Sequence, residues 1–234
     1  MNHSCDGWRL TVLAAVLIVP LTYLLLIHAP IAQDKGYHVF ADVRTCLGIN
    51  NFGNVASNMA FLMVGTWGAW WCALRMRGGA RLAWGIFFAG VALVFAGSAY
   101  YHAAPDDERL VWDRLPMTLA FMGLFAAMMS EHIGLQWERK LLYPALVLGV
   151  ASVLWWRYAD DLRVYVWVQG APLLAIPLVI ALFPARFSHR HYLLTGLAFY
   201  TAAKVAEYLD KPLYDLSLRS EEHTSELQSH SFIS

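Results

Sequence analysis

The sequence predicts an all-α membrane protein, a polytopic bundle of about seven transmembrane helices. Of its 234 residues, 59% are hydrophobic and 15% are charged, whereas soluble domains carry roughly 25% charged residues. Ten Trp, eleven Tyr and twelve Phe residues fit the aromatic belts that flank membrane spans. The formal net charge is zero, which gives no electrostatic reason to expect nucleic acid as a partner. We therefore expect one domain whose main partner is the lipid bilayer.

Seven apolar runs account for the expected helices. The first is about twenty residues long, enough to cross a bilayer and longer than the apolar core of a cleaved signal peptide. We therefore interpret residues 1–29 as an N-terminal signal anchor. Residues 30–216 are expected to form the transmembrane domain, in which the polar segment 30–51 is an ordered loop or an interfacial segment. The seven runs cover residues 8–29, 52–74, 81–102, 111–132, 140–156, 164–183 and 192–209.

Polar residues inside the apolar runs are expected to face other helices, because lipid offers them no hydrogen-bond partner. In the second run this expectation applies to Asn54, Ser57 and Asn58. Lys204 and Glu207 lie three residues apart in the last run and therefore on one helical face. The simplest structural interpretation is that they neutralise each other in a buried salt bridge.

The candidate site lies in residues 97–116, GSAYYHAAPDDERLVWDRLP. Ser98 and His102 are four residues apart and so lie one turn from each other on a helix. Asp113 follows a short acidic loop, near the start of the next run, and Pro116 is expected in the first turns of that helix. Polar groups near membrane depth are costly without partners, which would be each other, a metal or water. Helix capping beside a solvated loop is the alternative interpretation.

The order of the runs places this candidate site at one membrane surface. If every run crosses once, the same side holds segments 30–51, 103–110 and 157–163 and the chain after residue 209. The opposite side has somewhat more Lys and Arg residues, and cytoplasmic segments are enriched in both. We therefore expect the site on the extracytoplasmic side.

The other histidines are expected to have structural roles. His132, His189 and His191 fall on the side opposite the candidate site and therefore cannot share a metal with it. His28 and His38 are on the same side as the site. For each of these two, an interfacial or capping role is expected rather than metal ligation.

Residues 217–234 differ in composition from the rest of the chain. No apolar run follows Leu216, and RSEEHTSELQSH, residues 219–230, resembles translated sequencing-adapter sequence. We therefore expect a foreign, disordered tail that replaces the natural continuation of the chain. His223 and His230 would then carry no function. A natural disordered tail is the alternative.

Five short motifs carry a resemblance to a known family: YHVFADVR (37–44), GINNFGNVASN (48–58), SAYYH (98–102), the aspartate of WDRLPM (112–117) and AAKVAEYLD (202–210). Together they resemble the alkaline ceramidase family, and its bacterial branch most closely. This family belongs to a wider superfamily of heptahelical hydrolases that includes the progestin and adipoQ receptors. The resemblance covers about residues 37–216.

The resemblance implies a multi-pass, zinc-dependent amidohydrolase of the bacterial inner membrane that cleaves ceramide-like N-acyl lipids. In the family, a histidine at the end of one helix binds zinc together with the two histidines of an H-x3-H in the last helix. His102 matches the first ligand, and Asp113 matches the aspartate that holds and deprotonates the attacking water. Ser98 matches the serine that stabilises the developing oxyanion. The helix with the H-x3-H is missing, so this chain is expected to be inactive.

Other interpretations of the sequence stay open. Eukaryotic members of the family have a calcium site rich in Asp and Glu near the N-terminus. Asn51 and Asn54 stand near that place here, so the resemblance does not extend to calcium. The chain could instead be a receptor-like or lipid-binding heptahelical protein without catalysis. In a third interpretation it is a scaffold, in which the site residues only join helices by hydrogen bonds.

Overall fold

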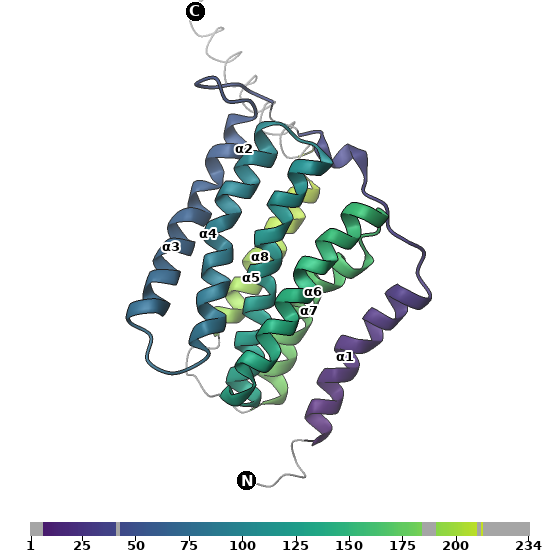
Figure 1. The fold of residues 1–234 in the computed structure, drawn as a ribbon, viewed down its shortest axis with the longest axis vertical. Helices are drawn as coiled ribbons and strands as arrows, with labels where there is room; N and C mark the ends of the chain where they lie inside the picture. Colours follow the sequence, from purple (N-terminus) through teal and green to yellow (C-terminus); the bar gives the residue numbers. More distant parts are fainter. Residues whose placement is uncertain (1–6, 41–42, 184–190, 210–211, 213–234) are drawn as a thin grey trace, which may run out of the picture.

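The computed structural model describes residues 7–40, 43–183, 191–209 and 212. All regular elements within these ranges are helical, and they pack as a bundle of roughly parallel and antiparallel rods (Figure 1). Two short 3₁₀ helices, η1 (Lys35–His38) and η2 (Leu135–Trp137), lie between the α-helices. The α-helices are α1 (Gly7–Leu26), α2 (Phe52–Ser57), α3 (Met59–Leu74), α4 (Arg81–Ala103), α5 (Asp107–Ile133), α6 (Glu138–Ala159), α7 (Arg163–Leu182) and α8 (His191–Tyr208).

Five helices are long and apolar enough to cross a membrane: α1, α4, α5, α6 with η2, and α7. The chain is therefore an all-helical protein with the features of a membrane-embedded one. The runs expected near residues 52–74 and 192–209 also form helices. However, α3 has only 16 residues, and α8 includes both Lys204 and Glu207.

The start of α5 differs from the prediction. We expected an acidic loop before a helix that begins near residue 111, but α5 begins at Asp107. Asp106 caps the helix, because its carboxylate accepts a hydrogen bond of 2.7 Å from the backbone N–H of Arg109. Acidic residues in a first turn also interact favourably with the helix dipole. Pro116 consequently lies inside α5 rather than in its first turns.

The run at residues 52–74 is divided at Asn58 into α2 and α3. Asn58 is buried, as predicted, and its amide donates a 2.8 Å hydrogen bond to the carbonyl of Asn54. Ser57 is exposed, contrary to the prediction. Its hydroxyl donates to the same Asn54 carbonyl at 2.9 Å. Because this bond lies within its own helix, Ser57 needs no partner on another helix.

Small residues let α4 and α5 approach closely near the candidate site. A Cβ atom added at Gly97 would lie 2.0 Å from the carbonyl oxygen of Trp112 and 3.2 Å from the Cα of Asp113. Further along the same contact, a Cβ at Gly90 would lie 2.6 Å from the backbone nitrogen of Ala120. Small residues commonly allow such backbone contact between membrane helices. Gly97 therefore sets the separation of the two helices at the site.

We expect Gly97→Ala to lower the thermal stability of the protein strongly. The new methyl group would overlap a backbone carbonyl, which cannot move as a flexible side chain can, and overpacking costs about 1–3 kcal/mol or more. Gly170→Ala in α7 is the matched control, because nothing lies within 4 Å of its added Cβ. Thermal unfolding in detergent, followed by tryptophan fluorescence, measures both variants. Equal melting temperatures for them would contradict the close α4–α5 contact.

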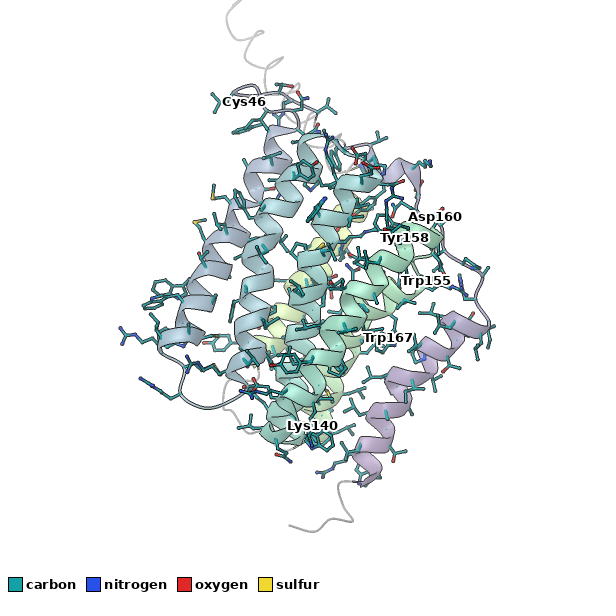
Figure 2. The ribbon with its side chains drawn as sticks, in the orientation of Figure 1. Cys46, Lys140, Trp155, Tyr158, Asp160 and Trp167 are labelled. Atoms are coloured by element: carbon teal, nitrogen blue, oxygen red, sulfur yellow. The ribbon has the colours of Figure 1, made fainter. Side chains whose placement is uncertain are left out.

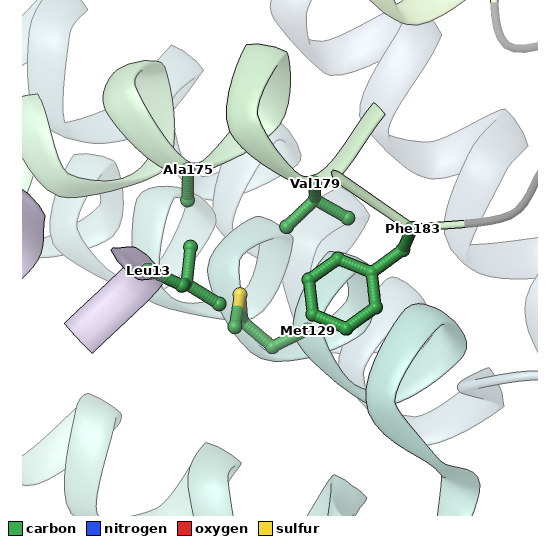
Figure 3. Packing of buried hydrophobic residues seen from close by; sticks show 5 residues of the cluster. All are labelled: Leu13, Met129, Ala175, Val179 and Phe183. Carbon is green, nitrogen blue, oxygen red and sulfur yellow. The ribbon is translucent and has the colours of Figure 1, made fainter. Parts of the chain in front are cut away.

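The N-terminal helix packs on α7 and α5. Figure 3 shows Leu13 of α1 beside Met129 of α5 and Val179 of α7, in a cluster completed by Ala175 and Phe183. The indole N–H of Trp167 also donates a 2.9 Å hydrogen bond to the carbonyl of Leu17. Helix α1 is thus joined to the bundle by apolar contacts and by this hydrogen bond.

Arg163 fixes the end of α1 that lies near the site. Its Nη1 donates to the carbonyls of His28 at 2.7 Å and Leu24 at 3.2 Å, which satisfies backbone acceptors beyond the last turn. Asp161 holds this guanidinium, with Oδ2 2.8 Å from Nη2. The Asp161 carboxylate also accepts a bond from the backbone N–H of Ile31 at 3.4 Å. The two side chains therefore connect α1, the segment after it and the start of α7.

We expect Asp161→Asn to destabilise the protein at neutral pH by about 1–3 kcal/mol, the cost of leaving the hydrogen-bond donors that face Asp161 poorly satisfied. The hydrogen bonds from Arg163 hold the pKa of Asp161 well below its ordinary value. Its stabilising effect is therefore fully present above about pH 4, the ordinary pKa of an aspartate. The effect is lost as the pH falls through the lower, folded-state pKa.

Melting temperatures of the parent and of Asp161→Asn, measured from pH 7 downwards, check this prediction. The difference between the two proteins should narrow in acid. Asp160→Asn is the control, because Asp160 is exposed and accepts a bond from the backbone N–H of Gln33 at 3.0 Å. A gap that stays constant down to strongly acid pH would show that the carboxylate charge of Asp161 is not what stabilises the fold.

Candidate functional site

Ser98 and Asp113 meet where α4 and α5 are closest. Both side chains are buried, with exposed fractions of 5% and 7%. The Ser98 side chain lies beside the Asp113 carboxylate. Gly97, the neighbour of Ser98, brings the backbone of α5 close enough for this contact. Two of the three residues named from the sequence are thus brought together directly.

His102 lies one turn beyond Ser98, in the last turn of α4, and is partly buried. Its ring packs against Phe40, with centroids 4.7 Å apart, and its carbonyl accepts a 2.8 Å bond from the amide of Asn51. The Nδ1 atom is buried and has no hydrogen-bond partner among the described residues. Because most buried polar atoms are paired, this nitrogen is suited to a ligand such as a metal ion.

Among the described residues, no three His, Cys, Asp or Glu side chains are grouped so that they could hold a metal ion. Protein zinc sites usually have three or four protein ligands. His102 fits one of these positions, and the resemblance implies two more histidines from an H-x3-H. The predictions for the tail, residues 219–234, fall outside the described residues.

Arg114 is a site residue that the sequence analysis missed. Its side chain is buried, with 5% of the residue exposed, and its guanidinium carbon lies 4.0 Å from the ring centroid of Trp156 and 4.7 Å from that of Tyr165. Its Nη2 donates a 2.6 Å hydrogen bond to Gln33. Aromatic faces stabilise a buried cation, and Arg114 offsets the charge of the adjacent Asp113. A basic residue inside an apolar run was the available signal.

Segment 33–40 covers the site from outside the helices. The Tyr37 ring is stacked on Tyr101 at an interplanar angle of 21°, and its hydroxyl donates to Glu207 at 3.3 Å. His38 lies 3.0 Å from the Tyr101 hydroxyl through Nδ1 and 2.9 Å from Asp107 through Nε2. His38 therefore has a structural role, in which it joins η1 to both α4 and α5.

Two other expectations concern residues near the site. Lys204 and Glu207 form the predicted salt bridge at 2.6 Å, but the side chains are 40% and 47% exposed rather than buried. His28 is exposed just after α1, with Nδ1 2.7 Å from the carbonyl of Ala29. The carboxylate of Glu207 also accepts the bond from Tyr37, so the end of α8 contributes to the polar cluster.

Of the segments expected on one side of the membrane, the described residues 30–40, 43–51, 103–110 and 157–163 lie at one end of the bundle (Figure 1). Hydrogen bonds join Leu162 to Ile31 at 2.8 Å, and His38 to Asp107 at 2.9 Å. Figure 2 shows Cys46 and Asp160 toward this end and Lys140 at the other. The fold and the site together define an all-helical membrane protein with a buried polar cluster near one end of its bundle.

Comparison of the chain with protein-family models, with curated proteins and with solved structures gave no match. The resemblance to the alkaline ceramidases therefore rests on the sequence motifs themselves.

Proposed function

We propose that the chain has the fold of a membrane-embedded, zinc-dependent amidohydrolase that acts on ceramide-like N-acyl lipids. The observation that carries the proposal is the contact of Ser98 with Asp113 one turn from His102, whose buried Nδ1 has no partner among the described residues. A hydroxyl, a carboxylate and a free imidazole nitrogen at one helix contact are the groups that amide hydrolysis requires. The interpretation as a plain scaffold leaves this nitrogen unexplained.

Each residue has a distinct role in this proposal. A zinc ion held by His102 would supply Lewis-acid activation of water and of the amide carbonyl. The Asp113 carboxylate accepts the proton of the attacking water and later returns it to the leaving amine. The Ser98 hydroxyl donates a hydrogen bond to the oxyanion that develops on the carbonyl oxygen. Arg114 and its aromatic neighbours keep the buried charge of Asp113 balanced.

The location of the polar cluster supports a lipid substrate. It lies near one end of a bundle that has five helices apolar enough to span a membrane. A lipid whose acyl chain lies in the bilayer could therefore place its polar amide, near the membrane surface, at this cluster. We further propose that all seven apolar runs cross the membrane, with α2 and α3 together forming one crossing and α8 another. This arrangement places α8, which carries the last family motif, beside the site.

The test compares two proteins. One is the 234-residue chain, and the other, which we call the extended chain, carries a helix with the H-x3-H after Leu216. We expect about one zinc per molecule and turnover of a fluorescent ceramide in the extended chain, and neither in the 234-residue chain. Elemental analysis measures the zinc. Equal turnover by both proteins would mean that the zinc amidase mechanism is wrong, and ceramide binding without turnover by both would favour the receptor-like alternative.

A further inference from the structure

An apolar groove lies on the outer face of α3 and α4, away from the candidate site. Its volume is about 610 Å³, and its lining consists of Met63, Val64, Trp67, Gly68, Trp71 and Phe88. Gly68 lets the Phe88 ring of α4 pack directly on the backbone of α3, because a Cβ at this position would lie 2.1 Å from that ring. Trp67 and Trp71 are both largely exposed and stand one turn apart on α3. This shape fits a flexible apolar chain that lies along the helix.

A cluster of arginines follows the groove at the turn between α3 and α4, and consists of Arg75, Arg77 and Arg81. Arg75 continues the four-residue spacing of Trp67 and Trp71, so it extends the same stripe of the helix. Its guanidinium carbon lies 5.7 Å from the ring centroid of Trp70. The Arg81 guanidinium reaches back to donate to the carbonyl of Ala73. The three side chains are thus held near the end of α3.

The three arginines outnumber the carboxylates beside them in the described part of the chain, where Glu131 and Glu138 both contact the start of α4. All three arginines are exposed, and none of them forms an ion pair with a described residue. The buried Glu131 accepts bonds from the backbone of Ala80 at 3.2 Å and from Trp84 at 2.9 Å, so its charge faces the start of α4. The remaining excess of positive charge at the turn suits an external anion.

We propose that this face binds an anionic phospholipid, with its phosphate on the arginine cluster and one acyl chain in the groove. Guanidinium groups bind phosphate oxygens in a planar, bidentate geometry, and basic clusters beside membrane helices bind anionic lipid headgroups. The apolar groove and the arginine cluster follow each other along one face of α3. The acyl chain and the phosphate follow each other in the same way in such a lipid. A zwitterionic lipid would leave the excess positive charge uncompensated. This proposal does not depend on the proposed hydrolysis.

Quenching of tryptophan fluorescence by brominated lipids tests the proposal on the full chain. The protein is reconstituted in vesicles of phosphatidylcholine that contain increasing fractions of phosphatidylglycerol, with the bromine on the acyl chains of one lipid at a time. We expect brominated phosphatidylglycerol to quench at a several-fold lower mole fraction than brominated phosphatidylcholine. The preference should weaken at high salt, because exposed charges are screened.

Two pairs of substitutions separate this site from general attraction to a charged membrane. Arg75→Gln with Arg77→Gln should remove the preference for phosphatidylglycerol. Arg139→Gln with Lys140→Gln is the control, because it removes the same amount of positive charge at the start of α6. This helix start lies at the same end of the bundle as the arginine cluster, since Glu138 accepts a bond from the backbone of Ala83, near the start of α4, at 3.0 Å. The preference should survive in this control.

A third variant locates the acyl chain. Quenching by brominated phosphatidylglycerol should have a component that saturates at a low mole fraction of this lipid. The variant Trp67→Phe with Trp71→Phe should lose that component. The proposal is overturned by any of three results: equal quenching by the two lipids in the parent, equal loss of preference in the two charge variants, or unchanged saturable quenching after both tryptophans are replaced. The last two results would mean non-specific attraction or another lipid position.

Discussion

His102→Ala in the extended chain should abolish both zinc binding and ceramide turnover. His102 is the one residue of the predicted ligand set that the structure describes, and its buried Nδ1 has no other partner there. A site left with two imidazoles falls below the three protein ligands usual for catalytic zinc. Elemental analysis of the purified variant and a fluorescent ceramide assay measure the two losses.

His28→Ala provides the control for the loss of a histidine. His28 lies at the same end of the bundle but is exposed, and its ring contacts the carbonyl of Ala29 and the edge of Tyr23. We expect this variant to keep both zinc and turnover. If His102→Ala instead retained one zinc per molecule, His102 would not be a ligand and the proposed function would fail. Melting temperatures of the two variants show whether a loss of activity reflects unfolding.

Asp113→Asn in the extended chain should keep much of the zinc and lose most of the rate. The carboxamide has nearly the shape of the carboxylate and can still lie beside Ser98. It cannot accept a proton from water, however, and loss of general-base catalysis typically costs about 10²–10⁴-fold in rate. Zinc content and turnover are measured on the same preparation, so that the rate is expressed per bound zinc.

Asp107→Asn is the matched control for this change. Asp107 is in the first turn of the same helix, and its carboxylate contacts His38 at 2.9 Å rather than Ser98. We expect a modest change in stability and little change in the rate per zinc. Parent-like turnover in Asp113→Asn would exclude this carboxylate as the base. A fall in zinc equal to the fall in rate would instead assign Asp113 a role in holding the metal.

The amino-acid sequence by itself determined the helical architecture. Each apolar run is helical, although residues 52–74 form two helices, and the run predicted at residues 81–102 corresponds closely to α4, Arg81–Ala103. This success has a simple physical cause, because an apolar run in lipid must satisfy its backbone groups internally and a helix does so. The spacing of Ser98 and His102 was likewise a local property, fixed by the pitch of the helix.

Local signals also explain where boundaries were misplaced. The acidic residues before α5 suggested a solvated loop, yet Asp106 caps the helix and its neighbours form the first turn. Hydropathy alone places a helix start at the first apolar residue, whereas capping moves the true start into the polar sequence that precedes it. A closer reading of the aspartate and glutamate pattern would have found this start.

The tertiary structure alone decided which residues surround the candidate site. Arg114 reaches Gln33 across 81 positions of the sequence, and Tyr37 reaches Glu207 across 170. No local periodicity encodes such contacts, because they depend on how the helices are packed and on the close approach that Gly97 allows. Ser98, His102 and Asp113 could be named from the sequence. Only the packing of α4 against α5, however, brings Ser98 and Asp113 into contact. The same packing leaves the His102 Nδ1 buried without a partner among the described residues.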